Sequence, residues 1–257
     1  MKTVKEHHFT CIIPARYAST RFPGKPLAVI GGKTMIQRVY DQACKVLPEV
    51  FVATDDKRIL DAVVSFGGRV IMTSHDHRSG TDRCSEAIDK IEKETGIDLD
   101  VIINIQGDEP FIKPEQIRLL MSCFSDESVE IATLIRKAGE GEDLFNPNQP
   151  KVVISSSGDA LYFSRSTIPY FREADENEWS YKHPYYKHLG IYAYKKETLK
   201  KITLLQHSSL EKAESLEQNR WIENNFKIRT AVTLWESLGI DTPEDLERAK
   251  EFLKDFD

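Results

Sequence analysis

Short apolar runs alternate with helix-period segments through the first half of this chain, and no other feature limits its fold as strongly. The apolar runs at 9–13, 50–53, 69–72 and 101–105 each have the length of a buried strand. Between the first two runs, apolar residues recur at helical spacing from Met35 to Leu47. Repeated strand–helix–strand units predict an α/β fold with a mostly parallel, Rossmann-like sheet that helices cover on both faces.

The rhythm changes after about residue 137. Two further strands, 151–154 and 160–163, are predicted to form a hairpin around Ser157-Gly158-Asp159. The polar segment 167–187 is expected to leave the sheet as a smaller lobed insertion. A strand near 189–194, a helix near 210–221, a strand near 229–234 and a last helix from Pro243 are also expected. We expect one domain over residues 1–257, with a lobe roughly within 137–195.

The charge balance and the cysteines exclude several classes of protein. Lysine and arginine number 35 against 41 acidic residues, a net charge of −6, which disfavours non-specific nucleic-acid binding. No apolar run approaches the roughly 20 residues that span a bilayer, and the first eight residues lack the apolar core of a signal peptide. Four scattered cysteines without a CxxC pair are typical of a reducing compartment. We therefore expect a cytoplasmic protein with neither nucleic acid nor membrane as partner.

The first predicted strand runs into a loop that carries three cations, Arg16, Arg21 and Lys25. The loop is neither GxGxxG nor Walker A, because it has one glycine and no GK[ST] ending. Ligands of open α/β sheets bind at the carboxyl ends of the strands, and guanidinium and ammonium groups there suit a polyphosphate. The alternative is a solvated basic loop. Two prolines and a glycine around the lysine indicate a shaped loop and favour phosphate binding.

An acidic turn, Gln106-Gly107-Asp108-Glu109-Pro110, directly follows the most apolar predicted strand. A carboxylate here can hold Mg²⁺ over the same sheet edge, because this ion takes few protein carboxylates and completes its shell with water and phosphate oxygens. The alternative is that Asp108 or Glu109 caps the next helix. Asp241 is a second candidate ligand if the C-terminal strand lies beside the central one, whereas Thr242 is expected to cap the last helix.

The sequence gives little support for a zinc site or for a hydrolase triad. His75 and His77 stand two residues apart with no further ligands nearby, which is not the spacing of a zinc site. We expect an ordinary loop there, leading into a polar turn at 79–83. No GxSxG sequence is present, so a hydrolase triad is not indicated.

These segments together closely resemble the 3-deoxy-manno-octulosonate (Kdo) cytidylyltransferases, or CMP-Kdo synthetases, over nearly the whole chain. The PARxxSxRxPxKxL pattern from Pro14 to Leu27 is shared with other cytidylyltransferases, including those for sialic acids. Asn219 is a departure, because the family commonly has an apolar residue there. The motifs specific to the Kdo enzymes are SGTDR at 79–83, NIQGDEP at 104–110, ALYFSRSTIP at 160–169, HLGIY at 188–192, LEQ at 216–218 and DTPEDL at 241–246.

The resemblance implies a nucleotide-diphospho-sugar transferase fold, a homodimer, and a role in lipopolysaccharide synthesis. The implied reaction joins CTP and Kdo to give CMP-Kdo and pyrophosphate, with Mg²⁺ as cofactor. By residue-by-residue carry-over, the nucleotide would contact Ala15, Arg16, Ser19, Lys25, Thr81, Arg83 and Gln106. The sugar would contact Gln106, Arg165, His188, Tyr192, Glu217 and Gln218. The catalytic residues would be Arg16, Lys25, Asp108 and Asp241, of which the two aspartates would bind the metal. The lobe within 137–195 would serve sugar binding and dimerisation.

Two alternatives stay open at this point. The sugar could be a related keto acid, such as 8-amino-Kdo or a sialic acid. A non-catalytic nucleotide-binding module is a different class, but it would have no use for paired metal-binding carboxylates beside a polyphosphate loop.

Overall fold

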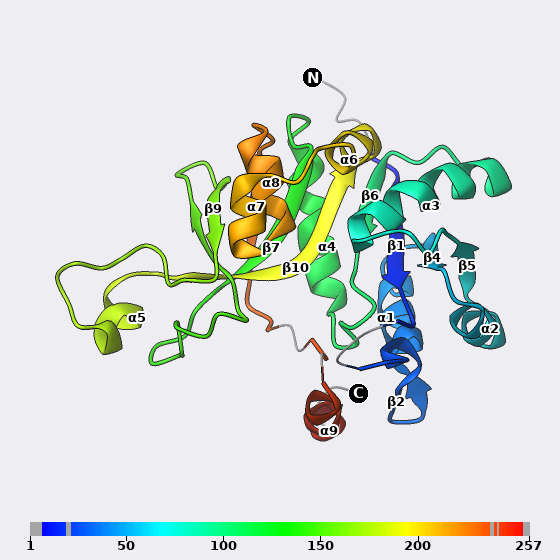
Figure 1. Ribbon diagram of the computed structural model, residues 1–257, viewed down its shortest axis with the longest axis horizontal. Helices are drawn as coiled ribbons and strands as arrows, with labels where there is room; N and C mark the ends of the chain where they lie inside the picture. Colours follow the sequence, from blue (N-terminus) through cyan, green and yellow to red (C-terminus); the bar gives the residue numbers. More distant parts are fainter. Residues whose placement is uncertain (1–6, 19–21, 237–238, 241, 254–257) are drawn as a thin grey trace. The chain divides into compact units, whose positions relative to one another are not determined.

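Two compact units make up the chain (Figure 1). The computed structural model describes residues 7–18, 22–236, 239–240 and 242–253. The first unit takes residues up to 118, 193–203 and those from 237 onward, and the second takes 119–192 and 204–236. The expectation of one domain with a lobe within 137–195 stays a prediction.

Parallel strands form the sheet of the first unit, in the order β6-β1-β4-β5. The chain passes from β1 to β4 and β5 on one side and then crosses back to β6 on the other side of β1. Because such crossovers are right-handed, α1 and α2 cover one face and α3 the other. Helix α3 packs across all four strands, whereas α1 contacts β1 and β4, and α2 contacts β4 and β5. These elements are β1 (Phe9–Ala15), α1 (Met35–Cys44), β4 (Val50–Thr54), α2 (Lys57–Ser65), β5 (Arg69–Met72), α3 (Gly80–Thr95) and β6 (Val101–Asn104).

This arrangement confirms the predicted α/β class and locates the edge where a ligand binds. The strand order reverses between β1 and β6, and in open parallel sheets the crevice at such a reversal receives the ligand at the carboxyl ends of the strands. The sheet interior is apolar, with Ile12, Val52 and Ile103 fully buried. The rest of this unit comprises η1 (Lys25–Leu27), β2 (Val29–Ile30), β3 (Lys33–Thr34), α6 (Lys196–Thr203) and α9 (Pro243–Phe252), while α4 (Pro114–Ser122) runs from the first unit into the second.

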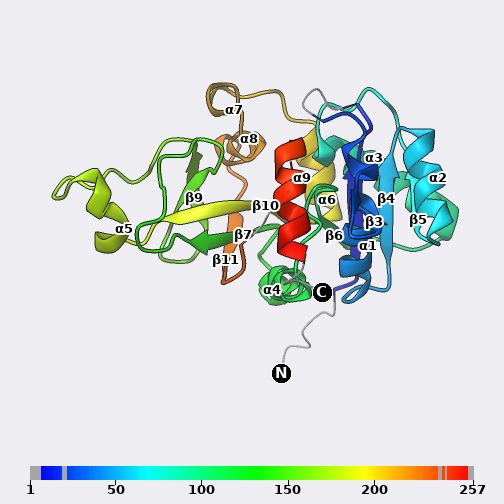
Figure 2. The ribbon, with the colours of Figure 1, turned by 90° about the horizontal axis from the view of Figure 1, so that it is seen from below.

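The last helix, α9, is drawn in red in Figure 2. Thr242 caps it as predicted: its side chain accepts a hydrogen bond from the amide of Asp245, whose own side chain accepts from the amide of Thr242. The helix contributes Ala249 to an apolar cluster with Met35, Phe111 and other buried residues. Helix α9 is thereby packed into the first unit.

In the second unit the strands follow the order β11-β7-β10-β8-β9. Strands β11 and β7 are parallel, and β8 pairs antiparallel with both β10 and β9. The predicted hairpin at 157–159 is confirmed between β8 and β9, with Gly158 at φ 82°. Strand β7 was not among the predicted strands. The elements are η2 (Cys123–Ser125), β7 (Ile131–Lys137), β8 (Lys151–Ile154), β9 (Ala160–Ser164), η3 (Glu176–Glu178), α5 (Trp179–Lys182), β10 (Tyr186–Lys195), α7 (Ser209–Glu214), α8 (Glu217–Glu223) and β11 (Ile228–Thr233).

The predicted single helix near 210–221 is wrong, because the chain breaks it into α7 and α8 at Ser215, which has φ 52°. Arg165 explains the break. Its Nε donates to the carbonyl oxygen of Glu214 at 2.7 Å, and a terminal nitrogen donates to that of Ser215 at 3.3 Å. In a continuous helix these two carbonyls would accept from amides of the next turn.

The polar turn expected at 79–83 is also wrong, because this segment begins α3. Ser79 is extended and its hydroxyl accepts a hydrogen bond from the amide of Asp82 at 3.1 Å, which is the geometry of an N-cap. Asp82 then lies in the first turn, where the helix dipole favours a negative charge.

The insertion at 167–187 takes part in a small apolar cluster. Trp179 and Tyr185 are buried with Ala138 and Leu144. The indole nitrogen of Trp179 donates to the carbonyl of Ala174 at 3.0 Å. Anchoring by these rings gives the segment 172–182 a defined path that its sequence pattern did not reveal.

The structure also bears on the cysteines and on membrane-spanning segments. All four cysteines are free thiols. Within the described ranges, no helix is long and apolar enough to cross a membrane.

Candidate active site

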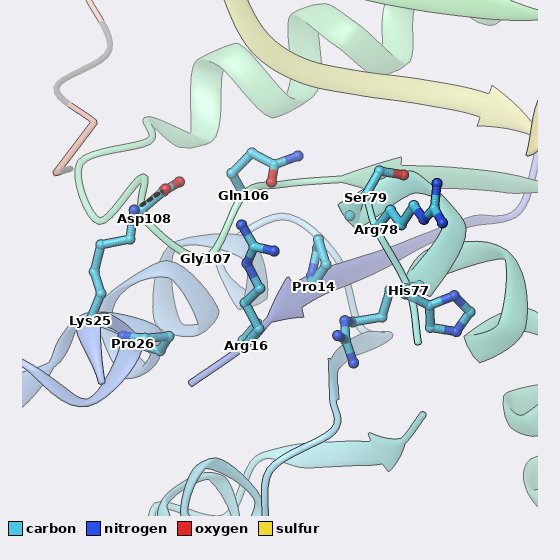
Figure 3. Close-up of a pocket in the computed structure, with 13 residues that line it drawn as sticks. Pro14, Arg16, Lys25, Pro26, His77, Arg78, Ser79, Gln106, Gly107 and Asp108 are labelled. Atoms are coloured by element: carbon cyan, nitrogen blue, oxygen red, sulfur yellow. Dashed lines mark hydrogen bonds and ion pairs between the residues drawn. The ribbon is translucent and has the colours of Figure 1, made fainter. Parts of the chain in front are cut away.

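A pocket of about 340 Å³ opens at the carboxyl ends of β1 and β6 (Figure 3). This is the edge at which the strand order reverses. Three segments far apart in the sequence meet there: the end of β1 with the basic loop, the start of α3, and the acidic turn after β6. The lining residues are Pro14, Ala15, Arg16, Lys25, Pro26, His77, Arg78, Ser79, Gly80, Arg83, Gln106, Gly107 and Asp108.

Two glycines allow these segments to converge on Pro14. A side chain at Gly107 would place its Cβ 3.1 Å from the carbonyl oxygen of Pro14, and one at Gly80 would place it 3.0 Å from the Pro14 ring. Both distances are tighter than ordinary van der Waals contact. Glycine at 107 and 80 is therefore what lets the acidic turn and α3 close around the end of β1.

Cationic side chains dominate the pocket. Arg16 and Arg78 are exposed, and in the described part of the chain neither makes an ion pair. The Lys25 ammonium lies 2.5 Å from Oδ2 of Asp108, the dashed contact in Figure 3. Arg83 is buried and fixed, because it donates to Oδ2 of Asp55 at 3.0 Å and to the hydroxyl of Thr73 at 2.6 Å. The pocket thus offers more positive than negative charge to a ligand.

The start of α3 adds donors of a second kind. Ser79 and Gly80 line the pocket at the helix N-terminus, where backbone N–H groups of the first turn have no partner within the helix. The positive end of the helix dipole points to the same place. Together with the cations, these groups suit an anionic ligand.

His77 and Arg78 line the pocket, although this segment was predicted to be an ordinary loop. The Nε2 of His77 contacts the carboxylate of Glu86, which also accepts from the amide of Ser74 at 2.9 Å. Burial raises the pKa of Glu86, but hydrogen bonds from Lys90, Ser74 and His77 outweigh it and lower the pKa to about 2. A cation next to the Ser79 N-cap was the signal that could have identified Arg78.

The predicted nucleotide-binding residues Ala15, Arg16, Lys25, Arg83 and Gln106 share this pocket with Asp108. The side-chain amide of Gln106 donates to Oδ1 of Asn104 at 3.3 Å. Thr81 is buried in the first turn of α3 and is not among the lining residues. Asp108 pairs with Lys25, which accounts for its position better than a helix cap would.

Ser19 and Asp241 lie outside the described residues. Residue 240 is described, and its amide donates to the main-chain carbonyl of Asp108 at 3.1 Å. Within the described ranges, no group of three or more histidine, cysteine or acidic residues is placed to hold a metal ion. The two-aspartate metal site therefore stays a prediction.

The predicted sugar-binding residues other than Gln106 lie in the second unit. His188 and Tyr192 are neighbours on β10, with ring centroids 5.3 Å apart, and Phe163 packs edge-on against His188 at 4.9 Å. Burial lowers the pKa of His188 to about 3 and raises the pKa of Tyr192 well above its usual value. The imidazole is therefore neutral at physiological pH.

Arg165, Glu217 and Gln218 are bound into the second unit. The Arg165 guanidinium donates to the carbonyls of Pro147, Glu214 and Ser215. Glu217 accepts from a terminal nitrogen of Arg220 at 2.8 Å, and Gln218 is buried. These three residues stay predicted sugar contacts.

Asn219 is the departure from the family pattern, and the structure shows how it is accommodated. The residue is fully buried, as an apolar residue would be. Its side-chain nitrogen donates to the carbonyl of Phe163 at 2.9 Å, and its side-chain oxygen accepts from the amide of the same residue at 3.3 Å. Both polar groups are satisfied, so the helix packs normally against β9.

Comparison with known sequences identifies relatives of this chain. The cytidylyltransferase family profile matches residues 10–228. A 3-deoxy-manno-octulosonate cytidylyltransferase of Bacteroides thetaiotaomicron is 57% identical over 249 residues, which cover 96% of this chain and 98% of the relative. One of Parabacteroides distasonis is 58% identical and covers 95% of this chain and 98% of the relative.

Solved structures agree as well. A CMP:2-keto-3-deoxy-manno-octonic acid synthetase complexed with CTP has a TM-score of 0.87 and 43% identity, covering 96% of this chain and 98% of its own. A 4-diphosphocytidyl-2C-methyl-D-erythritol synthase from Anaerococcus prevotii has a TM-score of 0.61 at 13% identity, with 96% of each chain covered, and shares the fold alone. The chain therefore belongs to the cytidylyltransferase family and, within it, to the 3-deoxy-manno-octulosonate cytidylyltransferases.

Proposed function

We propose that this chain transfers CMP from CTP to Kdo. The anomeric hydroxyl oxygen of the sugar forms a bond to the α-phosphorus, the bond from that phosphorus to the bridging oxygen breaks, and pyrophosphate leaves. The hydroxyl proton passes to solvent, and no side chain is assigned as general base. The product, CMP-Kdo, would serve lipopolysaccharide synthesis.

The observation that carries this proposal is the cation-rich pocket at the β1/β6 reversal, in a chain that is 57% identical to a Kdo cytidylyltransferase. Such a transfer needs alignment and charge stabilisation more than a covalent enzyme group. Arg16 and Lys25 would bind and orient the triphosphate, and the amides at the start of α3 would add fixed donors. Arg83, held by Asp55, would keep one wall of the pocket rigid.

Magnesium fits the chemistry of the acidic turn. Asp108 offers a partly exposed carboxylate that already accepts a cation, the Lys25 ammonium. Hard oxygen ligands are those that Mg²⁺ prefers. The amide of Ile240, the residue before Asp241 in the sequence, donates to the main-chain carbonyl of Asp108. When bound there, the ion would neutralise charge on the phosphates.

A pyrophosphate-release assay tests the function directly. Each nucleoside triphosphate is combined with Kdo, 8-amino-Kdo and a sialic acid, with Mg²⁺ and with a chelator. We expect release only with CTP, Kdo and the metal present. Equal release with sialic acid, or release without any divalent metal, would contradict the assignment.

We also propose a cytoplasmic homodimer. Four free thiols support a reducing compartment, in which CTP is available. Tyr170 and Tyr181 in the insertion are 74% and 59% exposed, and exposed aromatic side chains are typical of subunit contacts. Sedimentation equilibrium of the full chain should give twice the 29.4 kDa mass, and a monomer mass at micromolar concentration would refute the dimer.

A further inference from the structure

Thr133 is a polar residue at a fully buried position of β7. Its neighbours Ile131, Ala132, Leu134 and Ile135 are also fully buried, and all four are apolar. Valine has nearly the same shape as threonine and would suit such a strand. A buried hydroxyl needs a hydrogen-bond partner, so its partners indicate why it is there.

The Thr133 hydroxyl touches three groups on β10. Its Oγ1 lies 2.8 Å from the carbonyl oxygen of Ile191, 3.3 Å from that of Leu189 and 3.0 Å from Nε2 of His188. A hydroxyl has one hydrogen, and a carbonyl oxygen can only accept. Two oxygens 2.8 Å apart need that hydrogen between them, so Thr133 donates to Ile191. His188 must then donate from Nε2 to the threonine oxygen.

The remaining ring nitrogen of His188 is consequently an acceptor. Burial lowers the pKa of the imidazole to about 3, so the ring carries one hydrogen at neutral pH. Phe163 and Tyr192 pack against the ring and hold its plane. In the part of the chain that the structure describes, Nδ1 of His188 makes no hydrogen bond. A lone pair in this position accepts from a hydroxyl group and does not attract a carboxylate.

We propose that Thr133 is a positioning residue whose hydroxyl fixes His188 as the Nε2–H tautomer, so that Nδ1 accepts a hydrogen bond from a hydroxyl group of the sugar. The identity of the sugar rests on the proposed function, and its contact with His188 rests on the predicted sugar-binding role of that residue. The tautomer does not, because it follows from contacts within the second unit alone.

The first test measures the tautomer without any substrate. Long-range ¹H–¹⁵N spectra of the full chain at neutral pH distinguish a protonated from an unprotonated ring nitrogen, and a His188→Gln variant identifies the signal among the seven histidines. We expect hydrogen on Nε2 in the wild type and in Thr133→Ser. In Thr133→Val the Nε2 hydrogen loses its acceptor, and the Nδ1–H form should appear.

The second test measures use of the sugar. Thr133→Val should raise the KM for Kdo about tenfold, the size of one lost hydrogen bond, and leave the KM for CTP unchanged. Thr133→Ser should restore the wild-type value. Thr230→Val is the matched control, because Thr230 is the register partner of Thr133 on β11 and its hydroxyl donates to the carbonyl of Gly158 at 2.7 Å. It should lose a similar buried hydrogen bond without changing the KM for Kdo.

The outcomes separate the inference from the proposed function. Hydrogen on Nδ1 in the wild type, or an unchanged tautomer in Thr133→Val, would overturn the inference. So would a Thr230→Val variant that raises the KM for Kdo as much as Thr133→Val does, since the effect would then be structural. A wild-type enzyme that makes no CMP-Kdo would remove the sugar assignment, while the tautomer measurement would still decide the role of Thr133.

Discussion

The two groups of candidate site residues differ in how much of their bonding capacity the protein itself uses. In the pocket of the first unit, Arg16 is exposed and, in the described part of the chain, makes no hydrogen bond or ion pair. In the second unit, Arg165 donates from all three side-chain nitrogens to main-chain carbonyls. His188 is likewise held by a hydroxyl and two aromatic rings.

This difference distinguishes residues that are available to bind a ligand from residues that stabilise the fold. A cation whose donors are unused can give them to an incoming phosphate at little cost to the fold. A cation whose donors are already used stabilises the backbone around it, and its loss disturbs folding as well as any ligand. The comparison therefore predicts which substitutions change activity alone and which change both activity and stability.

The largest effect is expected at Asp108. Replacing it with asparagine keeps the size but removes the anionic ligand, and kcat should fall about a thousandfold, roughly 4 kcal/mol. The melting temperature should stay close to wild type, because the Lys25–Asp108 pair is partly exposed. Asp41→Asn, which removes the carboxylate of the surface pair with Lys33, is the control and should be silent.

Asp241→Asn should lower kcat as much as Asp108→Asn does. The double variant should lose little more activity than either single variant, since residues that serve one metal act as a unit. Kinetics and thermal melting of the three variants check this. An active or merely unfolded Asp241→Asn would reduce residue 241 to a helix-boundary role.

Lys25 comes next. Lys25→Ala should lower kcat about a hundredfold, close to 3 kcal/mol of transition-state stabilisation, and should change the KM for Kdo far less. Lys33→Ala removes a lysine with a half-exposed side chain from a surface ion pair and should leave both parameters unchanged. Steady-state kinetics decide the matter, and an unaffected Lys25→Ala enzyme would make the basic loop a solvated surface.

The two arginines test the comparison most sharply. Arg16→Ala should raise the KM for CTP about tenfold without lowering the melting temperature, because no hydrogen bond or ion pair among the described residues is lost. Arg165→Ala should lower unfolding stability by about 2 kcal/mol, since three carbonyls lose their donor. Denaturant unfolding measures the stability of each variant, and steady-state kinetics measures its KM for CTP. A loss of stability in Arg16→Ala would contradict the difference drawn between Arg16 and Arg165.

The smallest effect concerns pH between 6.5 and 5. Burial lowers the pKa of His188 from its ordinary 6.5 to about 3, so below pH 6.5 the unfolded chain binds a proton that the folded chain refuses. The stability that the neutral ring provides is complete above pH 6.5 and is lost as pH falls toward 3, by roughly 1 kcal/mol per pH unit. Glu86 and Glu142, with pKa values lowered to about 2, begin to add to this loss only near pH 4.5.

Unfolding measured between pH 6.5 and 5 should therefore show a slope that His188→Gln removes. His75→Gln is the control, because this histidine is exposed, and it should keep the slope. A wild-type curve that is flat in this range would mean that the folded chain does not keep the His188 imidazole neutral.

Much of the first unit could be predicted from sequence because its signals are local. The strand and helix periods gave the parallel sheet, and the rule that ligands bind at the carboxyl ends of strands placed Arg16, Lys25 and Asp108 at one edge. The close approach of Gly107 to the backbone of Pro14 was not predicted, because it depends on how β1 and β6 pair. Arg78 was missed because the Ser79 N-cap was read as part of a turn.

The second unit was harder to predict because its decisive contacts are remote in sequence. The break between α7 and α8 depends on Arg165, about 50 residues earlier in the chain, taking the carbonyls of Glu214 and Ser215. The proposed tautomer of His188 depends on the hydroxyl of Thr133, 55 positions away in the sequence. No periodicity or cap signal encodes such pairs, since each needs the sheet to be assembled first.

The most direct test of the account is a ³¹P NMR time course of the purified chain with CTP, Kdo and Mg²⁺. We expect one phosphodiester signal to appear for each pyrophosphate formed, with Asp108→Asn as an inactive control. Release of inorganic phosphate without a phosphodiester, or an equal rate when a sialic acid replaces Kdo, would contradict CMP transfer to Kdo.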